Sequence, residues 1–223
     1  MSLNHTYLNN VKALIFDMDG TLVDNIPYHL EAWLHFLSDH GIHLLPEEFH
    51  AQNHGTIDEM IARFFPHVMS EEKIIELGTE KEDIYRRIYK PHLKEVKGLS
   101  GFLETMKSKK LSLHLATMGD EVNINFTLEG LGILELFDSI TGGHEVKHGK
   151  PHPEIFEKAL KKSHVRPEEC LVFEDSGGGI RAAKAAGLTV VGITTSHTKQ
   201  ELMEMGCDEV ISDFDEAQKL FED

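Results

Sequence analysis

The 223-residue sequence predicts an α/β fold in which a doubly wound parallel sheet carries a small all-helical insertion after its first strand. Short apolar runs rich in β-branched residues recur along the chain, and helical patterns separate the later runs, which is typical of parallel sheets. The segment after the first run holds helical patterns only. With 40% hydrophobic residues, the chain can bury a sizeable core.

Five strands are expected from these runs, at residues 12–16, 111–116, 170–173, 189–193 and 209–211. After the first run, segments such as "YHLEAWLHFLSDHG" repeat apolar residues at helical spacing, with Gly41 and Pro46 as breaks. We therefore expect two domains. Residues 1–23 together with 97–223 form the core domain, and residues 24–96 form the inserted helical domain. Because parallel sheets bind ligands outside the carboxyl ends of their strands, an insertion that leaves from that edge is expected to form a cap.

The first strand runs into "IFDMDGT", in which Asp17 and Asp19 stand two residues apart. On an extended backbone, residues i and i+2 point to the same side, so the two carboxylates are expected to share one patch. Two like charges that close together are costly unless a cation lies between them. The structural alternative is a turn, since aspartate commonly opens turns and Gly20 suits one.

Polar residues also follow two other predicted strands. Thr117 ends one of them, and Glu174 and Asp175 follow another. Taken alone, Thr117 fits a strand residue and the Glu174–Asp175 pair fits a solvated turn. Together with Asp17 and Asp19 they would meet at one edge of the sheet, an arrangement that local structure does not explain.

Four carboxylates at one edge favour a hard divalent cation with oxygen ligands, and Mg²⁺ fits this description. Lys150, in "HGKPHPEIF", adds a positive charge on a segment that Pro151 and Pro153 stiffen, although an exposed loop lysine is the simpler alternative. The run "SGGG" from Ser176 can cradle an anion at a helix start or form a flexible turn. Metal, lysine and backbone N–H groups together would bind a trianion.

Charge and composition limit the partners. The formal net charge is −16, with 38 Asp and Glu against 22 Lys and Arg, which argues against nucleic acid as a partner. No apolar run approaches the roughly 18 residues that span a bilayer, and the polar start lacks the apolar core of a secretory signal. A cytoplasmic protein without membrane contact is therefore expected. Cys170 and Cys207 lack C-x-x-C spacing and are expected to be buried free thiols.

The motifs together resemble those of the haloacid dehalogenase (HAD) superfamily, specifically its β-phosphoglucomutase-like phosphatases with a small helical cap. "DMDGT" matches the first motif, Thr117 the second, Lys150 the third and Glu174–Asp175 the fourth. "VDNIPYHLEAW" also resembles the start of the cap in that subgroup. The resemblance implies a HAD-like Rossmannoid core and a Mg²⁺-dependent phosphatase that acts on a small phosphorylated metabolite.

The resemblance also implies roles for the carboxylates. Asp17 would attack phosphorus and form an aspartyl-phosphate, and Asp19 would protonate the leaving oxygen and then activate water. Mg²⁺ would be held by the Asp17 carboxylate, the Asp19 main-chain oxygen, Asp175 and Glu174. These roles agree with general electrostatics, because a carboxylate that binds a metal stays ionised, while a neighbour whose side chain does not bind the metal can hold a proton.

Thr117, the adjacent Met118 and Lys150 would bind the transferring phosphoryl group, where positioning and charge stabilisation supply most of the catalysis. A phosphomutase shares the first half-reaction and is an alternative. A dehalogenase fits less well, because carbon–halogen displacement needs no proton donor at Asp19. A phospho-acceptor receiver domain, which is a binding module, also gathers aspartates, a threonine and a lysine at the edge of a parallel sheet.

Four residues of the insertion align with substrate-facing positions of the cap, namely His29, Gly55, Asp58 and Lys81. Gly55 lies in "NHGTIDEM", which matches the substrate-reading loop, and Asp58 stands where the sugar-phosphate mutases carry an arginine. An aspartate there makes a mutase less expected. Without the resemblance, Lys81 would be interpreted as a solvated helix residue and His29 as a surface or core residue. The sequence does not define the oligomeric state, and a monomer is the working expectation.

Overall fold

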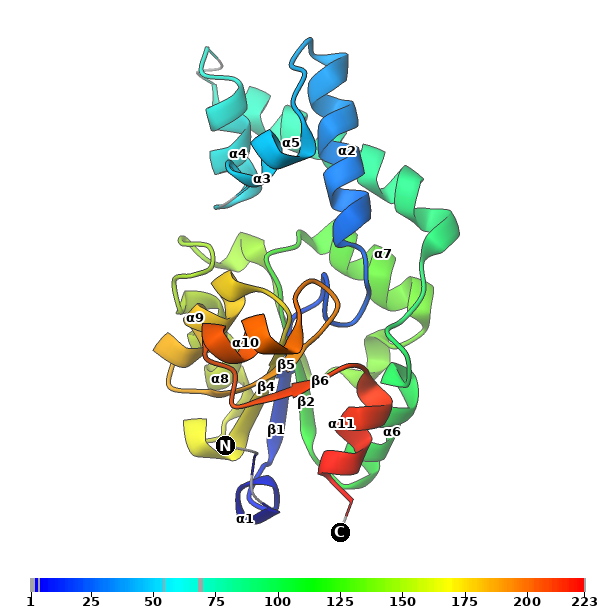
Figure 1. Ribbon diagram of the computed structural model, residues 1–223, viewed down its shortest axis with the longest axis vertical. Helices are drawn as coiled ribbons and strands as arrows, with labels where there is room; N and C mark the ends of the chain where they lie inside the picture. Colours follow the sequence, from blue (N-terminus) through cyan, green and yellow to red (C-terminus); the bar gives the residue numbers. More distant parts are fainter. Residues whose placement is uncertain (1–2, 4, 54, 68–69, 223) are drawn as a thin grey trace. The chain divides into compact units, whose positions relative to one another are not determined.

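The computed structural model describes residue 3 and residues 5–53, 55–67 and 70–222. The chain forms two compact units, one of Met1–Asp24 with Lys94–Asp223 and the other of Asn25–Leu93 (Figure 1). The first unit contains the sheet, whereas the described residues of the second contain helices and no strand. The second unit lies within the segment 24–96 that is expected to form a helical insertion.

Six parallel strands form the sheet of the first unit, in the order β3-β2-β1-β4-β5-β6. Their bounds are Ala13–Phe16 (β1), Ser112–Ala116 (β2), Ser139–Thr141 (β3), Cys170–Glu174 (β4), Thr189–Ile193 (β5) and Glu209–Ile211 (β6). The predicted α/β class with a parallel sheet is confirmed. The strand order reverses at β1, and such a switch point is where open parallel sheets bind ligands.

The sequence prediction misses β3. This edge strand has three residues, of which Ser139 and Ile140 are only half-buried, so it leaves no apolar run in the sequence. Its pairing with β2 nevertheless continues to the site edge, where the Thr117 N–H donates to the Thr141 carbonyl at 3.1 Å.

The parallel register brings the ends of three strands level with one another. Phe16, the last residue of β1, lies opposite Leu115 of β2 and Phe173 of β4. The Asp17 N–H then donates to the Phe173 carbonyl at 3.0 Å, which continues the ladder by one step. Asp17 and Glu174 are therefore brought to the same level of the sheet edge.

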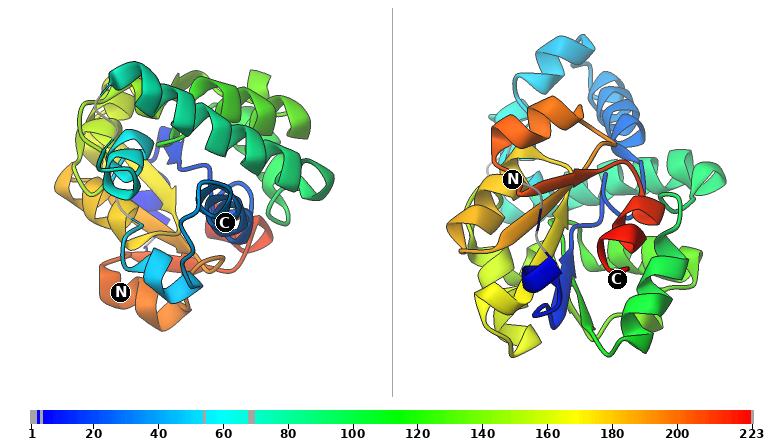
Figure 2. Two further views of the ribbon diagram at one scale, coloured as in Figure 1. Left: turned by 90° about the horizontal axis from the view of Figure 1, so that it is seen from above. Right: turned by 60° about the horizontal axis from the view of Figure 1, so that its bottom comes forward.

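Helices cover both faces of the sheet. The first unit contains α1 (His5–Leu8), α6 (Leu99–Ser108), α7 (Glu121–Leu131), α8 (Glu154–Ser163), α9 (Gly177–Ala185), α10 (Lys199–Met205), α11 (Phe214–Leu220) and the 3-10 turns η2 (Leu134–Leu136), η3 (Gly143–Glu145) and η4 (Pro167–Glu169). One buried cluster joins the sheet to α6, α7 and α11, and a second joins it to α8, α9 and α10. Figure 2 shows α9 and α10 on the side of the sheet opposite to α6 and α11.

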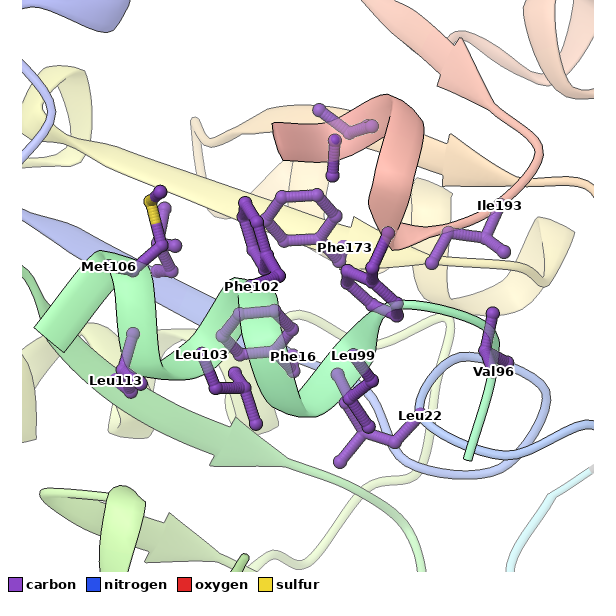
Figure 3. Close-up of a cluster of buried hydrophobic side chains, with 14 of the residues drawn as sticks. Phe16, Leu22, Val96, Leu99, Phe102, Leu103, Met106, Leu113, Phe173 and Ile193 are labelled. Carbon is purple, nitrogen blue, oxygen red and sulfur yellow. The ribbon is translucent and has the colours of Figure 1, made fainter. Parts of the chain in front are cut away.

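Alternation along β1 explains this double covering. Leu14 and Phe16 belong to the first cluster, whereas Ala13 and Ile15 belong to the second, as expected for a strand buried on both faces. Figure 3 shows the first cluster, in which the Phe16 ring stacks on Phe173 with centroids 4.9 Å apart. This aromatic packing holds the ends of β1 and β4 side by side, directly beneath the residues that follow them.

The second unit is built from α2 (Ile26–Asp39), α3 (Pro46–His50), α4 (Ile57–Phe64), α5 (Glu71–Tyr89) and the 3-10 turn η1 (Lys90–His92). Its buried aromatic residues come from four of these helices: Trp33 and Phe36 from α2, Phe49 from α3, Phe64 from α4, and Tyr85 and Tyr89 from α5. Its helices thus share an aromatic core of their own.

Two further sequence expectations concern membrane spans and cysteines. Among the described residues, no helix combines the length and the apolar character that crossing a bilayer requires. Cys170 and Cys207 are free and buried, which confirms the expectation for both thiols.

Candidate active site

Three buried carboxylates meet at the carboxyl edge of the sheet. Asp17 follows β1, Glu174 ends β4 and Asp175 follows it, with 6%, 0% and 2% of their surfaces exposed. One oxygen from each lies within 4.8 Å of the others. The structure therefore brings together three of the carboxylates that the strand-end pattern predicts.

Lys150 supplies the positive charge of this group. Its Nζ lies 2.6 Å from Asp17 Oδ1 and 2.7 Å from Glu174 Oε1, and it is 3.4 Å from the Ala116 carbonyl oxygen at the end of β2. Its side chain is 10% exposed and lies over the Phe156 ring of α8. The alternative of an exposed loop lysine is therefore wrong.

Burial and crowding shift the pKa of these groups. Burial raises the pKa of Asp17 to about 7, an effect that Lys150 opposes and that the charges of Glu174 and Asp19 strengthen. The pKa of Asp175 is raised well above its ordinary value by burial, with Glu174 and Asp17 adding to the rise. Burial alone would lower the pKa of Lys150, but Asp17 and Glu174 raise it above its ordinary value. One ammonium thus leaves the three carboxylates incompletely neutralised.

Glu174 also organises the start of α9. Its Oε2 accepts hydrogen bonds from the Asp175 N–H at 2.8 Å, the Ser176 N–H at 2.7 Å and the Ser176 hydroxyl at 3.0 Å. A Cβ on Gly179 would overlap with the Glu174 carboxylate. The "SGGG" run therefore gives Glu174 room beside the helix start, and two N–H groups at this turn bind a carboxylate of the protein.

The remaining predicted core residues lie around this group. Thr117 is buried after β2, and its hydroxyl accepts from the Gly119 N–H at 3.0 Å. Met118 is half-buried. Asp19 is half-buried as well, and its carboxylate is not a member of the close group of three, although its charge raises the pKa of Asp17. The close group of three therefore joins Asp17 to the end of β4, where Glu174 and Asp175 lie.

Sequence reasoning missed the hydroxyl and imidazole groups that hold Asp175. The Thr21 hydroxyl lies 3.4 Å from Asp175 Oδ1, the Ser196 hydroxyl donates to Oδ2, and His197 Nδ1 lies 2.9 Å from the Asp175 carbonyl oxygen. Ser196 and His197 belong to "TTSHT", directly after β5. The signal that points to Thr117, polar residues directly after a predicted strand, would have found them.

The residues expected to face substrate from the helical unit fall into two groups. Lys81 is 2% exposed, and its Nζ lies 2.8 Å from Glu82 Oε1 and 3.1 Å from His29 Nδ1. The alternative of a solvated helix lysine is therefore wrong. Gly55 and Asp58 are exposed, the latter in the first turn of α4.

Comparison with known proteins identifies the family. The family model described as haloacid dehalogenase-like hydrolase matches residues 14–193, which include β1 from Leu14 on, β2 to β5 and every residue of the carboxylate group. The chain belongs to this family.

Three haloacid dehalogenase-like relatives illustrate the range of similarity. A phosphorylated carbohydrates phosphatase from Thermotoga maritima is 32% identical over 199 residues, which are 88% of this chain and 92% of the relative. A HAD hydrolase of family IA, variant 3, from Entamoeba histolytica is 30% identical with a TM-score of 0.84, covering 95% of this chain and 98% of the other. A β-phosphoglucomutase from Clostridium difficile is 26% identical with a TM-score of 0.80, covering 95% and 97%.

These findings confirm the resemblance and the HAD-like fold inferred from the sequence. Membership of a hydrolase family also makes the chain an enzyme and removes support for the receiver domain, the binding module considered above. In this haloacid dehalogenase-like hydrolase, the carboxylate group fits a hard cation, because oxygen ligands outnumber the one buried ammonium beside them. Asp17, Glu174 and Asp175 each place one oxygen in this group. The oxygens of Glu174 also accept hydrogen bonds from Lys150 and from the Asp175 and Ser176 N–H groups.

Proposed function

We propose that this haloacid dehalogenase-like hydrolase is a Mg²⁺-dependent phosphatase that hydrolyses a small phosphorylated metabolite through an aspartyl-phosphate. The observation that carries the proposal is a buried Asp17 carboxylate that Lys150 holds at the switch point of the sheet, beside Glu174 and Asp175. The Thermotoga relative is named for phosphorylated carbohydrates, which supports a phosphorylated sugar as the substrate class.

Magnesium would be held by the carboxylates of Asp17 and Asp175 and by the Asp19 main-chain oxygen, with Glu174 adding negative charge. When bound, the ion neutralises the excess of carboxylates and the charge of the phosphoryl oxygens, so that the two can approach each other. Burial and neighbouring carboxylates raise the pKa of both aspartic acids, so a cation bound beside them would relieve the cost of their ionised forms.

The chemistry assigned to the chain has two steps. A carboxylate oxygen of Asp17 forms a bond to phosphorus, the bond from phosphorus to the substrate oxygen breaks, and Asp19 gives that oxygen a proton. Water then attacks the same phosphorus, Asp19 takes a proton from it, and the bond to Asp17 breaks to release inorganic phosphate. Lys150 neutralises charge on the phosphoryl group, and Thr117 and Met118 position it.

Replacing Asp17 by Asn tests the nucleophile. Asp17→Asn keeps the size of the side chain but removes its nucleophilic carboxylate, so we expect phosphate release to fall at least about a thousandfold. Phosphate release from a panel of sugar phosphates is measured with Mg²⁺, and circular dichroism verifies the fold. The control is Asp39→Asn, an aspartate with a 55% exposed side chain on α2. More than a few per cent of wild-type rate in Asp17→Asn would rule out this nucleophile.

A phosphomutase is the second candidate, because the Clostridium difficile structure is a β-phosphoglucomutase. Asp58 argues against it, since an exposed carboxylate repels the second phosphate of a bisphosphorylated intermediate by about 1 to 4 kcal/mol if the two approach closely. We expect incubation with β-glucose 1-phosphate, Mg²⁺ and a trace of the 1,6-bisphosphate to release free phosphate. Efficient formation of glucose 6-phosphate with little free phosphate would favour the mutase instead.

A further inference from the structure

The loop between β5 and α10, residues 194–198, contacts Asp175 of the carboxylate group and the turn at Gly20. We call it the β5 loop. Its Ser196 hydroxyl donates to Asp175 Oδ2, and its Thr195 hydroxyl donates to the Gly20 carbonyl oxygen. His197 Nδ1 lies 2.9 Å from the Asp175 carbonyl oxygen, which can only accept, so Nδ1 carries the proton of this hydrogen bond. Three consecutive side chains thus bind two loops that are distant in sequence.

The two loops held in this way are those that carry the proposed metal ligands. Gly20 follows Asp19 directly, and a Cβ on Gly20 would overlap with the Asp175 carboxylate, so the two loops pack against each other. The Gly20 N–H donates to the Val23 carbonyl at 2.8 Å, while Thr195 holds the Gly20 carbonyl. Both peptide groups of Gly20 are therefore fixed, and with them the direction of the Asp19 main-chain oxygen.

The β5 loop is itself anchored at both ends. The Thr194 N–H donates to the Ile211 carbonyl of β6 at 3.1 Å. At the other end, Thr198 and Glu201 form a capping box, in which the Thr198 N–H donates to Glu201 Oε2 at 2.8 Å. Rigid ends mean that the three donors are already in place before a ligand binds, which is what a supporting shell requires.

We propose that Thr195, Ser196 and His197 are positioning residues that fix Asp175 and the Gly20 turn for magnesium. Ser196 orients the Asp175 carboxylate, His197 holds the main chain of the same residue, and Thr195 holds the peptide beside Asp19. This inference rests on the proposed Mg²⁺ site. Nothing in the reaction passes through these three residues, so their effect is on the affinity for the ion.

The test is to measure Mg²⁺ binding directly, by calorimetric titration and by the rise in melting temperature with Mg²⁺, for wild type and Ser196→Ala. Loss of an outer hydrogen bond to a ligand typically weakens metal binding about 10- to 100-fold, and we expect a loss of at least about tenfold here. Ser196→Thr keeps the hydroxyl and is expected to bind within about threefold of wild type. Thr195→Val keeps the size of the side chain and removes its hydroxyl, and it is expected to weaken Mg²⁺ binding as well. This second variant provides the test if Ser196→Ala does not fold.

The matched control is Ser212→Ala, which removes a serine hydroxyl that donates at 3.0 Å to Glu216, outside the site. It is expected to bind Mg²⁺ as wild type does. Wild-type affinity in Ser196→Ala and Thr195→Val, with wild type itself binding Mg²⁺, would overturn the positioning role alone. Wild-type protein that binds no Mg²⁺, or binds it equally after Asp175→Asn, would overturn the proposed metal site and this inference with it.

Discussion

At the scale of single residues, the buried carboxylates of Asp17 and Asp175 lower the stability of the folded protein when no cation is bound. Both carboxyl groups are buried, and burial raises the pKa of each, with the charges of neighbouring carboxylates adding to the rise. A charge held in this way costs folding free energy when no cation is bound. The same arrangement prepares an ion site, since the cost is relieved when a cation arrives.

Asp175→Asn is therefore expected to raise the melting temperature of the protein in a chelator. The folded-state pKa of Asp175 lies above its unfolded value of 3.8, so its contribution to stability is greatest below that value and is lost as the pH rises through the folded pKa. The gain of Asp175→Asn over wild type should grow from pH 5 to pH 8. Differential scanning calorimetry at both values checks this.

Asp39→Asn is the control for this comparison, because its exposed side chain bears no burial cost. Added Mg²⁺ should stabilise wild type and leave Asp175→Asn nearly unchanged, since a ligand that binds the folded state stabilises it by mass action. A lower melting temperature for Asp175→Asn than for wild type in chelator at pH 8 would show that the Asp175 carboxylate does not destabilise the folded protein.

At the scale of elements, the turn after β1 combines a backbone requirement with a packing requirement. Gly20 has φ = +79°, a conformation that costs other residues roughly 1 to 2 kcal/mol, and it also packs against the Asp175 carboxylate. The turn after β1 and the turn after β4 are thus fitted to each other. A larger residue at position 20 would therefore displace the Asp175 carboxylate.

Gly20→Ala tests this fit. We expect a loss of more than about 2 kcal/mol in unfolding free energy and of most Mg²⁺ affinity, because both the backbone strain and the overlap with Asp175 apply. Gly132→Ala is the matched control, since Gly132 has φ = +71° and open space around its Cβ position. Chemical denaturation and Mg²⁺ titration measure the two effects. Equal losses in the two variants would show that only the backbone strain matters.

At the scale of the whole molecule, the acidic charge affects stability more generally. A formal net charge of −16 implies mutual repulsion, which salt screens over about 10 Å at 0.1 M ionic strength. Raising NaCl from about 0.02 M to 0.3 M in chelator should therefore raise the melting temperature by a few degrees. Choline chloride should act equally, because screening depends on ionic strength. A fall in melting temperature would show that surface ion pairs dominate.

The sequence determined the fold class and most of the candidate site. Apolar runs marked five of the six strands, and polar residues after three of these runs marked Asp17, Thr117 and the Glu174–Asp175 pair, because parallel strands end at one edge. This information is local: it lies in the pattern of neighbouring residues. The two free thiols were readable for the same reason.

Tertiary structure decided which of these groups meet. Lys150 contacts Asp17 and Glu174, which are 133 and 24 residues away in sequence, and the Ser196 hydroxyl contacts Asp175. Strand order, the three-residue β3 and the burial of Lys81 likewise depend on packing between distant segments. The local sequence pattern does not reveal such contacts, because the residues next to a position in the sequence do not specify which distant residues will pack against it in the fold. Candidate residues for the site could therefore be named from the sequence, whereas their charge balance and the hydrogen bonds that support them were set by the fold.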